Sequence, residues 1–75
     1  MPDVAPTAVE WLEDFCGRIG ATPPTAEERE TVLALAGVAA HASERIAAPI
    51  ACWVAGRHGV PLDEAMRVAR EVAPG

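Results

Sequence analysis

Apolar residues recur at intervals of three and four along most of the chain, a spacing typical of amphipathic helices. Prolines and glycines separate four such stretches, and no alternating pattern typical of strands competes with them. The pattern therefore predicts an all-α fold, a compact bundle of about four short helices in a single domain. The predicted helices cover residues 7–19, 26–45, 49–57 and 62–72 of the domain 1–75, and residues 1–6 are predicted to be a flexible lead-in.

Capping residues mark the ends of the first two predicted helices. Thr7 with Glu10, and Thr25 with Glu28, have the T-x-x-E spacing of a capping box. Gly20 follows the first helix, at the position where a left-handed residue commonly ends a helix. We therefore expect each of these two helices to begin directly after its threonine.

Pro49 interrupts the long apolar pattern that begins at residue 26. A proline inside a helix loses a hydrogen bond and clashes with the preceding turn, whereas in the first turn it is well tolerated. We therefore predict a tight corner over residues 46–48 and a new helix from Pro49. The preceding helix has an alternative end near Ser43, and a single helix kinked at the proline is the main alternative.

Large apolar side chains are few, because much of the 51% hydrophobic fraction is alanine. A domain of this size buries only about 60% of the surface that its unfolded chain exposes, so it often needs further support. We also predict a homodimer, since one chain has little core in which to bury all of its apolar stripes. The expected core residues are Trp11 or Phe15, Leu12, Leu35, Ile50, Trp53 and Met66.

The net charge of −5 is concentrated in the first half of the chain. Residues 1–31 contain seven acidic residues and two arginines, whereas residues 32–75 are balanced. This distribution argues against nucleic acid as a partner, and against anionic membrane surfaces. No run approaches the ~18 apolar residues that would span a bilayer, and residues 1–15 lack the pattern of a secretory signal, so we expect a cytoplasmic protein.

A basic patch supports one alternative to these expectations. Arg57 and His58 precede a glycine-containing turn, and Arg67 and Arg70 follow it, as in a helix-turn-helix DNA-binding protein. The net acidity and the absence of lysine count against this alternative, and a solvated charged face is the favoured interpretation.

The two cysteines lie within apolar helical patterns, where a free thiol behaves as a small hydrophobic side chain. We expect Cys16 and Cys52 to be reduced core residues, and a disulfide between them is the alternative for a secreted protein. A zinc site built from these cysteines with His41 and His58 lacks the close ligand pairs of known zinc motifs. We therefore predict no metal and no cofactor.

No catalytic set is recognisable in residues 41–45, which contain a histidine, a serine, a glutamate and an arginine. His41 and Ser43 are two residues apart, so they lie on different faces of a helix and cannot form a nucleophile–base pair there. His41 and Arg45 are four apart and share a face. They either cap helix carbonyls and pair with nearby acids, or form a binding surface for an acidic or phosphate-bearing partner.

The stretch from Val38 through His41, Glu44 and Arg45 to Pro49 resembles a small actinobacterial domain family of unknown function. Members occur alone or attached to molybdopterin-guanine dinucleotide biosynthesis proteins. The similarity extends over about residues 9–73 and also includes the W-L-x-x-F opening and the E-A-x-x-x-A end.

The resemblance implies an accessory module for cofactor assembly that lacks the guanylyltransferase's own nucleotide-binding motif. We therefore predict a non-enzymatic accessory or protein-interaction module, linked to guanylylation of the molybdenum cofactor and partnered by its guanylyltransferase. The predicted binding residues are His41, Glu44, Arg45 and Pro49. A small-ligand or nucleotide-binding helical domain that uses His41 and Arg45 is the alternative, ahead of DNA binding.

Overall fold

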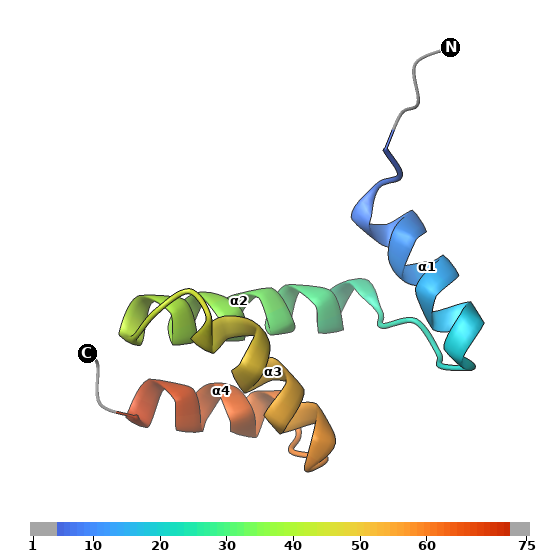
Figure 1. The fold of residues 1–75 in the computed structure, drawn as a ribbon. Coiled ribbons are helices and arrows are strands. Elements are labelled where there is room, and N and C mark those ends of the chain that lie inside the picture. Colours follow the sequence, from blue (N-terminus) through green and yellow to red (C-terminus); the bar gives the residue numbers. More distant parts are fainter. Residues whose placement is uncertain (1–4, 73–75) are drawn as a thin grey trace.

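A computed structural model describes residues 5–72, which form four α-helices joined by short connections (Figure 1). No strand occurs within this range, so the predicted all-α bundle of about four short helices is confirmed. Of the predicted lead-in, residues 1–4 lie outside the described residues. The helices are α1 (Ala8–Ile19), α2 (Ala26–Ala42), α3 (Ala47–Arg57) and α4 (Leu62–Glu71).

Both predicted capping boxes form, and they fix the starts of α1 and α2. The Thr25 hydroxyl accepts a hydrogen bond from the Glu28 backbone N–H at 3.1 Å, and the Glu28 carboxylate accepts one from the Thr25 N–H at 2.7 Å. Thr7 and Glu10 make the same pair of bonds at 3.1 and 2.8 Å. Gly20 ends α1 in the left-handed conformation, with a φ of +75°, as predicted from the sequence.

Replacing Thr25 with alanine is expected to lower the free energy of unfolding by about 1 kcal/mol, because the Glu28 backbone N–H at the start of α2 loses its hydroxyl acceptor. Urea denaturation followed by circular dichroism measures the change. Thr25→Ser keeps the hydroxyl acceptor and is expected to stay within about 0.5 kcal/mol of the original chain. Equal losses in both variants would contradict a capping role for Thr25.

The chain turns between α2 and α3 earlier than Pro49, the residue that requires the break. Helix α2 ends at Ala42 with Ser43 as its C-cap, and α3 begins at Ala47. Pro49 therefore lies in the first turn of α3, where a backbone N–H has no partner within the helix in any case. The alternative end near Ser43 is therefore confirmed for α2, α3 begins two residues before the predicted Pro49, and the kinked single helix is excluded.

Helices α3 and α4 both pack along α2, which is the central helix of the unit. The starts of α2 and α4 adjoin at Thr31 and Asp63, and their ends adjoin at Val38 and Ala69, so the two helices run in the same direction (Figure 1). Leu35 lies at the centre and is only 3% exposed, which confirms its predicted place in the core.

Helix α3 packs against α2 through its small side chains, contrary to the sequence-based prediction. Ala48, Ala51 and Cys52 are half-buried, whereas Ile50 and Trp53 are 56% and 60% exposed. The helix is apolar almost all round, so the apolar spacing does not decide which face turns inward. Small residues let two helices approach closely, and here the alanine face is the one that packs. The predicted core positions of Ile50 and Trp53 were therefore wrong.

Helix α1 stands apart from the unit formed by α2–α4 (Figure 1). It makes no contact with any other helix comparable to those that α3 and α4 make with α2. As a result Trp11 and Phe15 are both exposed, so neither fills the core as predicted, whereas Cys16 is buried and Leu12 and Met66 are half-buried. The Cα radius of gyration is 14.2 Å, against about 11 Å for a fully packed domain of this length.

Candidate functional site

The four predicted binding residues all lie at the surface around the corner between α2 and α3. His41 belongs to the last turn of α2, Glu44 and Arg45 form the corner, and Pro49 lies in the first turn of α3. The corner is closed by backbone hydrogen bonds from Ala47 N–H to the Glu44 carbonyl, at 2.9 Å, and from Ala48 N–H to the Arg45 carbonyl, at 3.1 Å. The backbone thus holds this segment without help from its side chains.

The side chains of this corner are not engaged with the rest of the described residues. Between residues 5 and 72, no hydrogen bond or ion pair involves the side chain of His41, Glu44 or Arg45. The prediction that His41 and Arg45 cap carbonyls or pair with nearby acids is therefore not supported. Their polar groups face solvent and are free to meet a partner.

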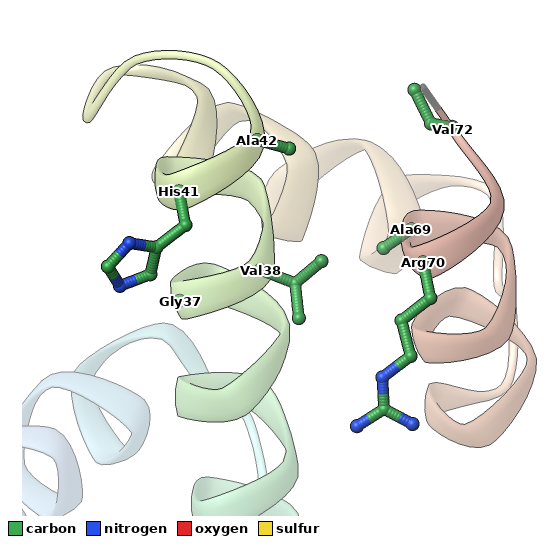
Figure 2. A pocket seen from close by; sticks show the side chains of 7 residues that line it. All are labelled: Gly37, Val38, His41, Ala42, Ala69, Arg70 and Val72. Atoms are coloured by element: carbon green, nitrogen blue, oxygen red, sulfur yellow. The ribbon is translucent and has the colours of Figure 1, made fainter. Parts of the chain in front are cut away.

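A hollow of about 540 Å³ lies beside this corner, between the ends of α2 and α4. Its walls are mainly apolar, with Val38 on α2 and Ala69 and Val72 towards the end of α4. Figure 2 shows that the ring of His41 points away from α4, and that the guanidinium of Arg70 lies on the other side of the hollow. The two polar side chains therefore do not converge on a common ligand position.

The largest exposed apolar side chains next to the corner continue along one face of α3. Ile46, Ile50 and Trp53 are 65%, 56% and 60% exposed, and their spacing of four and three places them in one row. Arg57 continues this row, and the carbon of its guanidinium group lies 5.1 Å from the centroid of the Trp53 ring. We call these four residues the α3 outer face. It combines an apolar row with a cation held over an aromatic ring.

The sequence prediction missed the α3 outer face because it assigned Ile50 and Trp53 to the core. A signal was nevertheless present in the sequence. The opposite side of the same helix carries Ala48, Ala51 and Ala55, residues that permit close packing of two helices and leave the bulky side for another surface.

Two of the arginines near the turn between α3 and α4 contact neighbouring side chains. Arg67 contacts the carboxylates of Glu71 at 2.9 Å and Glu64 at 3.9 Å, and Arg57 lies over Trp53. These contacts favour the interpretation of Arg67 as part of a solvated charged face, where such exposed pairs stabilise a helix only slightly.

Neither cysteine is paired with the other. The Cys52 thiol is half-buried against α2 and lies 3.9 Å from the Val32 carbonyl, to which it is positioned to donate a weak hydrogen bond. Burial raises the pKa of the Cys52 thiol above its ordinary value, which makes the reactive thiolate scarcer at neutral pH. Together with the burial of Cys16, this agrees with the predicted packing role of both residues.

Two further properties of the described range concern metals and membranes. No group of three or more His, Cys, Asp and Glu side chains is placed to hold a metal ion within residues 5–72. Over the same residues, no helix is both long enough and apolar enough to cross a bilayer.

Comparison with known proteins places the chain in a family. No curated protein and no solved structure matches it. A family described as a domain of unknown function, DUF6457, matches residues 3–75, which is nearly the whole chain. The chain therefore belongs to the DUF6457 family of domains of unknown function.

Proposed function

We propose that the chain is a non-enzymatic protein-interaction module that docks through the α3 outer face and the adjoining corner. The observation that carries this proposal is the exposure of Ile46, Ile50 and Trp53 in a single row, next to the unengaged side chains of Glu44 and Arg45. Apolar residues gathered in this way mark interaction sites more often than isolated exposed ones do.

The chemistry of this surface suits a protein partner better than a small ligand. Tryptophan and arginine are among the residue types most enriched in binding hot spots, and Trp53 and Arg57 lie together on this surface. Arg45 and Arg57 place positive charge on a surface whose helix contains no acidic residue. A partner with an apolar pocket and an acidic rim would complement it.

Residues that could perform catalysis do not converge near this surface, which supports a non-enzymatic role. His41 lies on the last turn of α2 and Ser43 caps that helix, and no hydrogen bond joins their side chains within the described residues. A nucleophile and its base must lie within hydrogen-bonding reach of each other.

The specific partner that we propose is the guanylyltransferase of molybdenum cofactor maturation. The support is the resemblance of residues 38–49 and of both ends of the chain to domains that occur attached to molybdopterin-guanine dinucleotide biosynthesis proteins. Isothermal titration calorimetry with the guanylyltransferase encoded in the same genome tests this partner. Saturable binding is the expected result. No heat and no co-elution at 100 μM of each protein would remove this partner, although other protein partners would remain.

The alternative function is the binding of a small phosphate-bearing ligand at His41 and Arg45. The hollow of Figure 2 offers it little support, because the His41 ring points away from Arg70. Addition of millimolar GTP is therefore expected to leave the amide NMR signals of residues 41–49 in place. Saturable shifts confined to that segment would favour the ligand-binding alternative over the proposed function.

A further inference from the structure

We propose that the chain forms a two-fold symmetric dimer in which α1 of each copy lies between α3 and α4 of the other. The surface that receives it, here called the α3/α4 groove, is lined by Val54 on α3 and by Val60, Val68 and Val72 towards and along α4, with Leu35 of α2 beneath. This surface lies on a different side of α3 from the outer face. The dimer therefore does not depend on the function proposed above.

The shape and the apolar lining of the α3/α4 groove suit the binding of a helix. It is an open hollow of about 430 Å³, and every residue that lines it is apolar except Glu64. Helices α3 and α4 each pack on α2 but make no comparable contact with each other, so the space between them lacks a fourth helix. An amphipathic helix laid into an apolar groove is a common mode of recognition, and it would complete a four-helix bundle.

Helix α1 has the complementary surface. Its apolar residues lie on one side, where Trp11, Phe15 and Ile19 follow each other at intervals of four and are 53%, 45% and 62% exposed. The rings of Trp11 and Phe15 are stacked, with centroids 5.1 Å apart. A helix of 12 residues is only marginally stable in water unless its apolar face packs against something. Helix α1 thus needs a surface that the α2–α4 unit of its own chain does not give it.

The connection between α1 and α2 favours the groove of another copy over that of the same chain. Pro23 and Pro24 hold the preceding residues in an extended conformation, so the linker is stiff. Arg29 donates a hydrogen bond to the Pro24 carbonyl at 3.4 Å, and the capping box at Thr25 fixes the start of α2. Helix α1 is consequently directed away from the α2–α4 unit (Figure 1). A short connection that directs α1 outward leaves it free to pack on a second copy, as in the exchange of an identical element between protomers.

The charges of the two surfaces set the orientation of α1 in the groove. Helix α1 carries Glu10, Glu13 and Asp14 against a single arginine, and Glu64 is the one charged residue among the described residues that line the groove. Docking therefore requires the acidic side of α1 to face solvent, away from Glu64.

Sedimentation velocity of the full chain between 1 and 300 μM tests the dimer. The original chain is expected to reach twice its monomer mass within this range. Phe15→Glu, on α1, and Val68→Glu, in the groove, are each expected to weaken association at least 100-fold, because a carboxylate would be buried among apolar side chains at both symmetric contacts. Both positions are exposed in the single chain, so circular dichroism is expected to retain the helices of the α2–α4 unit.

A mixture of the two variants tests directly whether α1 is exchanged between copies. A mixed pair retains one intact contact, between α1 of the Val68→Glu copy and the groove of the Phe15→Glu copy, so a heterodimer is expected where neither variant associates alone. Trp53→Ala, on the α3 outer face, is the control and is expected to dimerise like the original chain. A monomer at every concentration, a dimer insensitive to either glutamate, or no association in the mixture would each overturn the proposal. Loss of dimer in Trp53→Ala would show that the outer face forms the contact instead.

Discussion

Replacing Leu35 with alanine is expected to lower the free energy of unfolding by about 2–5 kcal/mol, a large part of what a domain of this size has available. Leu35 is 3% exposed at the centre of α2, and the residues that pack around it from α3 and α4 are mostly alanines and valines. Small neighbours such as Ala51, Ala55 and Ala65 have little side chain with which to fill the space that the lost leucine atoms would leave. Urea denaturation at a fixed chain concentration measures the change.

Leu33 provides a matched control for this prediction, because it is the same residue type, on the same helix, two positions away. It is 71% exposed, so Leu33→Ala removes almost no buried area and is expected to change stability by no more than about 0.5 kcal/mol. Similar losses in Leu33→Ala and Leu35→Ala would contradict the packing described for α2. The comparison also removes helix propensity as a cause of the difference, since both variants introduce the same alanine.

Replacing Trp53 with alanine is expected to weaken binding of the proposed protein partner by about 2–4 kcal/mol, roughly 30- to 1000-fold in Kd. Trp53 is 60% exposed at the centre of the α3 outer face, so its ring is available to fill a pocket of the partner. Part of the lost affinity would come from Arg57, because its guanidinium lies over the Trp53 ring and would no longer be held there. Calorimetry with the proposed partner, the purified guanylyltransferase, measures the affinity.

The same variant is expected to leave the free energy of unfolding within about 0.5 kcal/mol of the original, because the ring covers little of the core. Leu33→Ala, which removes an even more exposed side chain from α2, is expected to bind the proposed partner normally. A Trp53→Ala protein that binds as tightly as the original would exclude the α3 outer face as the docking surface. A Trp53→Ala protein that is strongly destabilised would show that the ring belongs to the core after all.

The helix boundaries were the most predictable part of the structure, because they depend on neighbours in the sequence. The threonine–glutamate pairs at Thr7 and Thr25 formed as predicted, and Gly20 took the left-handed conformation that ends α1. The corner before Pro49 was predicted only approximately, since a proline is tolerated at several positions in the first turn of a helix. The binding residues around that corner were placed at the surface, but their function remains a prediction.

The orientation of each helix was harder to predict, because the spacing of apolar residues defines an apolar face but does not indicate which surface that face packs against. In α3 the alanines pack on α2 and the bulky residues stay outside, so Ile50 and Trp53 belong to the surface. In α1 the apolar face is clear, yet no helix of the same chain covers Trp11 or Phe15. Side-chain size and the stiffness of the 22–24 linker decide these two outcomes.

The sequence by itself determined the class of the fold, the number of helices and the capping of the first two, since these follow from local spacing and local hydrogen bonds. Only the tertiary structure decided which apolar surfaces remain open. It brought Leu35, Val54 and Val68, which are distant in sequence, to one groove, and it turned Trp53 outward. Helix packing depends on how closely two backbones can approach, and that distance is set by pairs of surfaces rather than by either helix alone.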